Sequence, residues 1–310
     1  MQGLVIRNTG SWYEVRTNDG IILKCKVKGN FRLRGIRSTS PVAVGDRVKL
    51  RANEDGTAYI CEIEDRKNYI IRRASNLSKQ SHILAANIDM AFLFFTINYP
   101  ETSSVFVDRF LASAEAYRIP VCILFNKIDL YTEKDKQEME HYKSIYSDMG
   151  YPCFSISVLK EEGIDEMPIL LKDKITLFAG NSGVGKSALV NKLIPSAHAS
   201  IGALSDSHNA GMHTTTFSEM YDLPDGGSLI DVPGVKGFGT FDFEPHEVSH
   251  YFRDIFAVSR ECRFSDCMHL EEPHCAVLKA VGEGRIASSR YQAYLSMLGD
   301  KDEDKYRPSY

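Results

Sequence analysis

The chain has 310 residues, of which 43% are hydrophobic and 25% charged, a composition typical of globular proteins with room for two or three domains. No apolar run reaches the roughly 18 residues of a membrane helix, and the N-terminus lacks the pattern of a signal peptide, so we expect a cytoplasmic protein that does not enter a membrane. Residues 1–73 hold 15 Lys or Arg against 8 Asp or Glu, whereas the remainder holds 22 against 33. This basic module favours a polyanionic partner, although a solvated, Lys-rich strand surface explains its charge equally well.

The first 70 residues predict short strands separated by turn signals. Residues 12–17 and 21–27 flank Asn18-Asp19-Gly20, as in a hairpin, and 44–50 and 57–63 predict two more strands. We expect residues 1–70 to form an OB-like β-barrel, a fold that either binds single-stranded nucleic acid or is purely structural. The polar, basic residues that follow are predicted to be a linker over 71–87.

From residue 88 onward, apolar runs alternate with helical patterns. The runs at 89–97, 120–125 and 174–180 predict strands buried on both faces. This alternation predicts an α/β domain with a parallel, doubly wound sheet over 88–244. Residues 245–300 are predicted to form a helical module, and 301–310 a disordered tail.

The stretch GNSGVGKS matches the phosphate-loop pattern GxxxxGK[ST] and lies between a predicted strand and a predicted helix. Glycines let backbone N–H groups converge on phosphate oxygens, and the start of the helix favours an anion. Lys186 is expected to reach the β- and γ-phosphates, and the Ser187 hydroxyl to ligate Mg²⁺. The predicted phosphate-site residues are Gly180, Asn181, Ser182, Gly183, Val184, Gly185, Lys186, Ser187 and Ala188.

A second motif, DVPG, follows the predicted strand at 228–230. Asp231 could hold Mg²⁺ through water, and the Gly234 amide could sense a γ-phosphate. Alone, the motif is also compatible with a simple turn at the end of a strand. Together with the phosphate loop it favours a nucleoside triphosphate site.

A third motif, NKID, follows the predicted strand at 120–125 and indicates guanine recognition. The Asp129 carboxylate would accept hydrogen bonds from guanine N1–H and the exocyclic amine, a donor pair that adenine lacks. Asn126 would bridge the base and neighbouring loops, and the Lys127 stem would cover the ring. Ser157 and Val158, after the strand at 151–156, are candidates for a backbone contact to the base oxygen, and an ordinary polar turn is the alternative.

The stretch between the phosphate loop and DVPG has few core residues and ends in GMHTTT, which indicates a switch segment. Thr214 or Thr215 should reach Mg²⁺ and the γ-phosphate, and the sequence leaves the choice open. Ras-like GTPases carry a water-orienting glutamine directly after DxxG, where this chain has Val235. Valine cannot hydrogen-bond water, so intrinsic hydrolysis should be slow. His213 is the candidate catalytic residue, and an uninvolved loop histidine is the alternative.

The C-terminal region carries a cluster of metal-ligating residues. Three thiols and one imidazole, at Cys262, Cys267, His269 and Cys275, suit tetrahedral Zn²⁺, and four protein ligands predict a structural site. His274 is an alternative ligand, and buried thiols without a metal are the alternative to any site. Zinc would stabilise a helical module too small to fold alone.

In most GTPases the phosphate loop comes first and NKxD follows, but here NKID and the Ser157 segment come first. A circularly permuted GTPase domain explains this order. The permutation, the barrel and the order of NKID, GNSGVGKS, GMHTTT, DVPG and the Cys/His cluster together resemble the ribosome-small-subunit-dependent GTPases of RsgA type. The resemblance covers nearly the whole chain. It implies a monomeric GTPase with GTP and Mg²⁺ that acts in late maturation of the small ribosomal subunit, contacts its rRNA and is stimulated by it.

Two other functions remain open from the sequence. The first is a guanine-nucleotide-gated RNA-binding switch whose hydrolysis is incidental. The second is a nucleotide-dependent metabolic enzyme, which the guanine motif and the absence of a second catalytic constellation disfavour.

Overall fold

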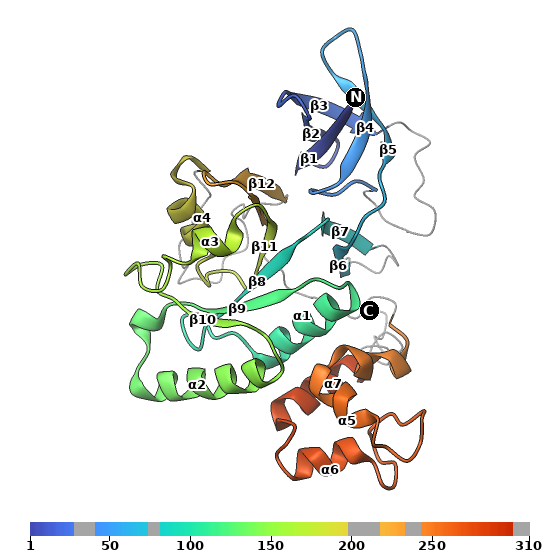
Figure 1. Ribbon diagram of the computed structural model, residues 1–310, viewed down its shortest axis with the longest axis vertical. Helices are drawn as coiled ribbons and strands as arrows, with labels where there is room; N and C mark the ends of the chain where they lie inside the picture. The colour runs from blue at the N-terminus through green and yellow to red at the C-terminus, as the bar shows by residue number, and fades with distance from the viewer. Residues whose placement is uncertain (28–40, 74–80, 198–217, 233–242, 300–310) are drawn as a thin grey trace, which may run out of the picture.

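The structure is a computed structural model that describes residues 1–27, 41–73, 81–197, 218–232 and 243–299. Three parts follow one another along the long axis of the molecule: a β-barrel, a central sheet covered by helices, and a helical module (Figure 1). This agrees with the predicted fold class. Among the described residues, no helix is both long and apolar enough to cross a membrane.

The N-terminal barrel has five strands in the order β1-β2-β3-β5-β4, and pairing of β1 with β4 closes it. Its residues alternate between the interior and the surface because side chains of a strand point to opposite faces, as in β2, where Tyr13, Val15 and Thr17 are buried. The hairpin predicted around residues 18–20 is confirmed by the antiparallel pairing of β2 with β3. The strands are β1 (Gln2–Asn8), β2 (Tyr13–Thr17), β3 (Ile22–Val27), β4 (Arg47–Ala52) and β5 (Ala58–Ile63).

The segment predicted as a linker contains two strands instead of irregular chain. Strand β6 (Tyr69–Arg73) pairs antiparallel with β7 (Ser81–Ala86). Ile71, Ile83 and Ala86 are buried with Ala43 of the barrel region in a small hydrophobic cluster. The polar composition of 71–81 concealed these buried positions. The hairpin places the barrel against the rest of the chain: Ala86 N donates to Val44 O at 2.9 Å.

The central sheet has the order β10-β9-β8-β11-β13-β12. All pairs are parallel except the pair of β12 with β13, as predicted for a doubly wound domain. Alternate residues of β8 enter two cores: Leu93 and Phe95 pack on the face of α1 and α2, and Phe92 and Phe94 on the other face. The strands are β8 (Met90–Phe95), β9 (Val121–Phe125), β10 (Cys153–Ser155), β11 (Ile175–Ala179), β12 (Glu219–Asp222) and β13 (Ser228–Asp231).

Helices follow the strands of this sheet as a parallel topology requires. Helix α2 begins with a capping box in which the Thr132 hydroxyl accepts from Asp135 N and the Asp135 carboxylate accepts from Thr132 N. The elements are α1 (Ser104–Ala116), η1 (Ile128–Leu130), α2 (Glu133–Asp148), α3 (Met167–Leu171), α4 (Lys186–Leu193) and η2 (Pro195–Ala197).

The C-terminal module consists of η3 (Pro245–Tyr251), α5 (Arg253–Ser259), α6 (Ala276–Gly282) and α7 (Ser288–Gly299). It packs on α1 through a hydrophobic cluster that includes Ala112, Phe252 and Tyr294. The buried Arg290 guanidinium connects the two parts, because it donates to Asp108 of α1 at 2.8 Å and to Asp254 of α5 at 2.9 Å.

Candidate nucleotide and metal sites

Four motifs predicted from the sequence meet at one edge of the central sheet. The Ser157 segment, NKID, the phosphate loop and Asp231 follow or end β10, β9, β11 and β13, respectively. Because parallel strands present their carboxyl ends at the same edge, these motifs become neighbours despite their distance along the chain. Ligands of open α/β sheets bind at this edge, so its contacts define the candidate nucleotide site.

The phosphate loop joins β11 to α4 in a conformation that requires glycine. Gly180, Gly183 and Gly185 have φ values of 149°, 81° and 104°, a region in which residues with a Cβ are strained. A Cβ on Gly185 would also lie 2.3 Å from Asn126 Nδ2. The loop therefore depends on glycine for its backbone shape and for its contact with NKID.

Lys186 lies across the phosphate loop, where its ammonium group donates to Gly180 O at 2.8 Å and Asn181 O at 2.7 Å. The side chain is buried, which lowers the pKa of Lys186, while the nearby Asp231 raises it in part. A buried cation enclosed by backbone carbonyls, beside a helix start, suits a phosphate ligand.

Asp231 has the properties of a ligand for a hard cation. Its Oδ1 atom is buried and has no hydrogen-bond partner within the described ranges. Burial raises the pKa of the Asp231 carboxyl, Lys186 lowers it, and Glu219, opposite Asp231 on β12, raises it. An unpartnered carboxylate oxygen beside the phosphate loop fits Mg²⁺, which prefers oxygen ligands. Ser187, which carries a hydroxyl, lies in the first turn of α4 directly after Lys186.

Asn126 connects the predicted base site to the phosphate loop. Its Nδ2 donates to Val184 O at 2.8 Å, and its Oδ1 accepts from Val158 N at 3.4 Å. The side chain is 1% exposed, so these contacts fix its orientation. One asparagine thus joins three of the predicted motifs.

Asp129 and Ser157 are also in direct contact, since the Ser157 hydroxyl donates to Asp129 Oδ1 at 2.5 Å. The same hydroxyl accepts from Lys160 N at 3.1 Å. These bonds orient a carboxylate that can accept two more hydrogen bonds from a ligand. Lys127 has a left-handed backbone, and its ammonium group donates to the carbonyl of Tyr99.

The structure adds two residues that the sequence analysis missed. The Tyr131 hydroxyl donates to Asn126 O at 2.8 Å and accepts from Ile97 N at 2.9 Å, so it holds the NKID turn against the end of β8. Glu219 faces Asp231 across β12 and β13. Tyr131 follows an ordinary turn, and Glu219 lies in a strand that was not predicted from the sequence. Neither residue belongs to a recognisable motif.

Other predicted site residues lie outside the residues that the structure describes. These are His213, Thr214, Thr215, Gly234 and Val235. Their roles stay predictions from the sequence.

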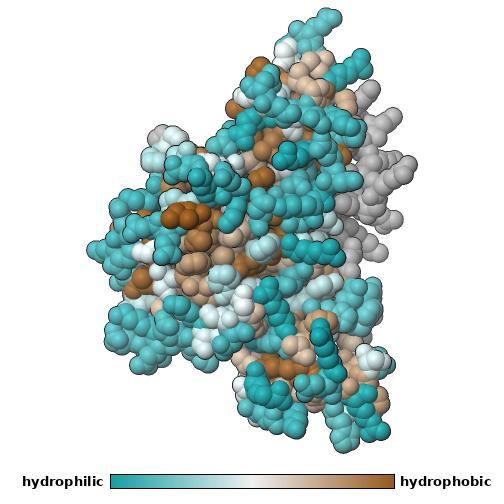
Figure 2. Space-filling model, in the orientation of Figure 1, coloured by the Kyte–Doolittle hydropathy of each residue, from teal (hydrophilic) through white to brown (hydrophobic). Residues whose placement is uncertain are grey.

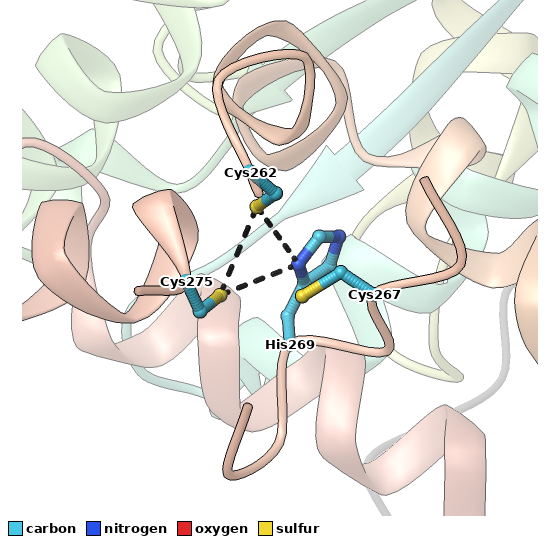
Figure 3. A group of neighbouring side chains, drawn as sticks. All are labelled: Cys262, Cys267, His269 and Cys275. Carbon is cyan, nitrogen blue, oxygen red and sulfur yellow. Dashed lines mark hydrogen bonds between the residues drawn. The ribbon is translucent and has the colours of Figure 1, made fainter. Parts of the chain in front are cut away.

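The four predicted metal ligands come together in the C-terminal module. Their ligand atoms, from Cys262, Cys267, His269 and Cys275, all lie within 4.8 Å of one another (Figure 3). His269 Nδ1 is 3.6 Å from Cys262 Sγ and 3.5 Å from Cys275 Sγ, and the two sulfurs are 3.9 Å apart. A tetrahedral zinc with Zn–S of about 2.3 Å and Zn–N of about 2.0 Å requires S···S of about 3.8 Å and S···N of about 3.5 Å. These distances fit zinc.

Hydrogen bonds from neighbouring side chains fix the backbone of the loop that carries the cluster. The Tyr291 and Tyr294 hydroxyls donate to His269 O and Met268 O, each at 2.7 Å, and so attach the ligand loop to α7. The Glu272 carboxylate accepts from Met268 N at 2.6 Å and Leu270 N at 2.8 Å. Burial lowers the pKa of His269 and so favours the neutral imidazole that binds metals. His274, the alternative ligand, is exposed and outside the cluster.

Comparison with known families matches two parts of the chain. Residues 2–60 match the RsgA N-terminal domain, and residues 63–241 match the RsgA GTPase. The first match covers the barrel as far as the middle of β5, and the second covers β6, β7 and the central sheet.

Curated relatives match the chain over its full length. It is 60% identical over 310 residues to a Bacteroides fragilis protein named small ribosomal subunit biogenesis GTPase RsgA, with 100% of both chains covered. A Porphyromonas gingivalis protein of the same name is 57% identical over 315 residues, again with 100% of both covered. A third, from Flavobacterium psychrophilum, is 46% identical and covers 99% of this chain and 95% of the relative.

Two solved structures share the fold. The crystal structure of YjeQ from Thermotoga maritima has 34% identity and a TM-score of 0.75, with 99% of each chain covered. YloQ, described as a circularly permuted GTPase, has 30% identity and a TM-score of 0.69, with 100% of this chain and 96% of the other covered. Full-length identity, the shared fold and the permuted motif order agree, and the chain is a GTPase that belongs to the RsgA family.

Proposed function

We propose that this protein hydrolyses GTP in late maturation of the small ribosomal subunit, in the cytoplasm, and that the subunit stimulates the hydrolysis. The observation that carries the proposal is the sheet edge at which the phosphate loop, Asp231, Asn126 and Asp129 meet. The names of the relatives support the small subunit as partner. The protein would act as a monomer that contacts the rRNA of the subunit.

The site would bind the nucleotide along the sheet edge. The loop from Gly180 to Ala188 would hold the phosphates with its backbone N–H groups, and Lys186 would exchange its carbonyl contacts for phosphate oxygens. Asp129 would accept from guanine N1–H and the amine, since Ser157 already orients one of its oxygens. Val158 N and the Lys127 stem would complete the base site.

Magnesium would be held by Ser187 and by Asp231, directly or through water, together with Thr214 or Thr215. When bound, it neutralises charge on the β- and γ-phosphate oxygens. The Gly234 amide would sense the γ-phosphate. In the C-terminal module, Cys262, Cys267, His269 and Cys275 would bind one structural zinc ion.

Hydrolysis would depend on an external signal. Val235 occupies the position where Ras-like enzymes use glutamine, so the isolated protein should turn over slowly. His213 would orient the attacking water once the small subunit orders the switch segment.

The role of His213 can be tested by substitution. His213→Ala should lower subunit-stimulated hydrolysis of GTP by about a hundredfold or more, the range for loss of a positioned acid or base, while GTP affinity stays near wild type. His208→Ala, a change in the same segment, serves as the control. Full stimulated turnover in His213→Ala would exclude the histidine from catalysis.

A further inference from the structure

Three charged side chains form a row across neighbouring strands, from the barrel to the candidate nucleotide site. Arg7 of β1 lies opposite Glu219 of β12, and Glu219 lies opposite Asp231 of β13. Residues directly opposite each other in antiparallel strands have their side chains on the same face, with Cβ atoms about 5 Å apart. The three side chains are therefore neighbours on one face, and we call them the charged row. In Figure 1, β12 lies between the barrel and the rest of the central sheet.

Glu219, in the middle of the charged row, is oriented by contacts to both of its carboxylate oxygens. Arg7 Nε lies 3.7 Å from Glu219 Oε1, and the Tyr221 hydroxyl donates to Glu219 Oε2 at 3.1 Å. Arg7 also lies 4.0 Å from Glu14 of β2, so it stands between two carboxylates. The side chains of Arg7 and Glu219 are 44% and 29% exposed. An ion pair this exposed contributes little to stability, so it can separate easily.

The inner end of the charged row is the carboxylate proposed to hold magnesium. Asp231 Oδ1 is buried and has no hydrogen-bond partner in the described part of the chain. Burial raises the pKa of the Asp231 carboxyl, Lys186 lowers it, and the charge of Glu219 raises it. The carboxylates of Asp231 and Glu219 thus repel each other, and a cation at Asp231 would relieve that repulsion.

The contact between β1 and β12 does not depend on the charged row, because apolar residues also support it. Met220 of β12 is buried in the core on the side of α1, and Ile6 of β1 packs against that core. The hydrogen bond from Ala86 N to Val44 O attaches the barrel at a second place. Figure 2 shows that the visible face of the molecule is mainly hydrophilic, with small hydrophobic areas. Loss of Arg7 should therefore leave the barrel in place.

From these observations we infer that Glu219 is a positioning residue for magnesium at Asp231, and that Arg7 of the barrel regulates its effect. The Glu219 carboxylate adds negative charge beside Asp231 and so favours a divalent cation there. Arg7 partly neutralises that charge, so a movement of β1 that separates the pair would strengthen magnesium binding. The inference rests on the proposed magnesium site, and it adds a route from the barrel to the nucleotide. The alternative is an ion pair that only stabilises the contact between β1 and β12.

Removal of the two partners of this ion pair should have opposite effects. Magnesium is titrated into the full-length protein with a fluorescent, non-hydrolysable GTP analogue, and the magnesium concentration for half-maximal binding of the analogue is measured. Glu219→Gln removes charge that favours the cation, and should raise this concentration by about threefold or more. Arg7→Ala leaves the Glu219 charge without its cation, and should lower the concentration by about twofold. A pair that only stabilises the contact between the strands would shift both variants in the same direction.

A double variant tests whether Arg7 acts through Glu219. When Arg7→Ala is combined with Glu219→Gln, the effect of Arg7→Ala should largely disappear, because the charge that Arg7 neutralises is gone. Arg7→Lys keeps the cation and should behave as wild type. Arg16→Ala is the matched control, since Arg16 of the barrel pairs with Asp222 at the other end of β12, opposite Ser228. It removes an ion pair between the same two parts of the chain, and should leave the magnesium concentration unchanged.

Three results would overturn the inference alone: shifts of the same sign, or none, in Arg7→Ala and Glu219→Gln; an effect of Arg7→Ala that persists in full in the double variant; or an equal shift in Arg16→Ala. Binding of the analogue to wild type that ignores magnesium would overturn the proposed magnesium site as well. The assay contains no ribosomal subunits, so loss of subunit-stimulated hydrolysis would leave its result unchanged.

Discussion

At the scale of single residues, the phosphate end and the base end of the candidate site depend on each other. Asn126 Nδ2 donates to Val184 O inside the phosphate loop, and Gly185 leaves room for that amide. A change at one end is therefore transmitted to the other.

Gly185→Ala tests this dependence. The new Cβ would lie 2.3 Å from Asn126 Nδ2, in a backbone with a φ of 104°, so both ends of the site must shift. We expect GDP affinity, measured by calorimetry, to fall by at least about tenfold, the effect of losing one or two hydrogen bonds to a charged ligand. Gly20→Ala, also at a positive φ but with nothing within 4 Å, should bind GDP normally.

If Asp231 holds magnesium as proposed, the magnesium requirement should depend on pH. Burial raises its pKa, so the carboxylate takes up a proton at a higher pH than an exposed aspartate does. The Mg²⁺ concentration for half-maximal hydrolysis should therefore rise as the pH falls. The nucleotide phosphates titrate as well, and the pH dependence that remains in Asp231→Asn measures the contribution of the phosphates alone. An equal pH dependence in wild type and Asp231→Asn would contradict this role.

At the scale of elements, the metal cluster ties the loop 262–275 to α6 and α7. Cys275 caps α6, since its sulfur accepts from Leu278 N at 3.4 Å, and the Tyr291 hydroxyl of α7 donates to the carbonyl of His269.

Cys267→Ser should lose zinc and lower the melting temperature, as chelators should in the wild type. His274→Asn keeps a residue type that tolerates the positive φ of 61°, and should retain zinc. A metal analysis that finds no zinc bound to wild-type protein purified in reductant would exclude the site.

The contact between α1 and the C-terminal module depends on a buried ion pair. Arg290 is 1% exposed and lies between Asp108 and Asp254, with its guanidinium carbon 4.7 Å from the centre of the Phe252 ring. Arg290→Met would leave the buried Asp108 and the partly buried Asp254 without their cation, and should lower the free energy of unfolding by about 3–5 kcal/mol. Arg285→Met, which removes an exposed pair with Glu283, should cost no more than about 1 kcal/mol.

The cost of Arg290→Met should also depend on pH. Burial raises the pKa of Asp108 to about 6 even though Arg290 lowers it, and Tyr146 and Asp254 are the other titratable groups beside it. A raised pKa in the folded state favours folding at low pH, and this contribution is lost as the pH rises through about 6. Without Arg290 the pKa of Asp108 rises further, because the charge that lowers it is lost. The difference in the free energy of unfolding between Arg290→Met and wild type, measured with denaturant, should therefore be smaller in mildly acidic than in alkaline buffer.

At the scale of the whole molecule, the order of motifs along the chain and their order in space differ. NKID precedes the phosphate loop in sequence, yet Asn126 contacts that loop through Val184. The sequence suffices to predict this meeting, because each motif follows an apolar run and parallel strands align their carboxyl ends. The Cys/His cluster was likewise predicted, because three thiols and one imidazole within 14 residues supply the four ligands that tetrahedral zinc requires.

The strands that connect the barrel to the rest of the chain could not be predicted. β6 and β7 are short, and the residues between their apolar parts, from Arg72 to His82, are mostly polar in sequence. This composition resembles a linker, and only the packing against Ala43 shows the role of the two strands. β1 and β12 were missed as well, although they connect the barrel to the central sheet through the pair Arg7 and Glu219. Such joints depend on contacts between distant segments, which leave no periodic pattern in the local sequence.

The proposed coupling of the nucleotide site to a ribosomal partner is tested most directly by steady-state GTP hydrolysis with and without purified small ribosomal subunits. Large subunits and ATP provide the controls. We predict slow turnover alone and strong stimulation by small subunits only, with ATP left unused because of the proposed selection of guanine by Asp129. Slow turnover that no subunit changes would contradict the proposed function, and would leave a guanine-nucleotide switch with a different partner.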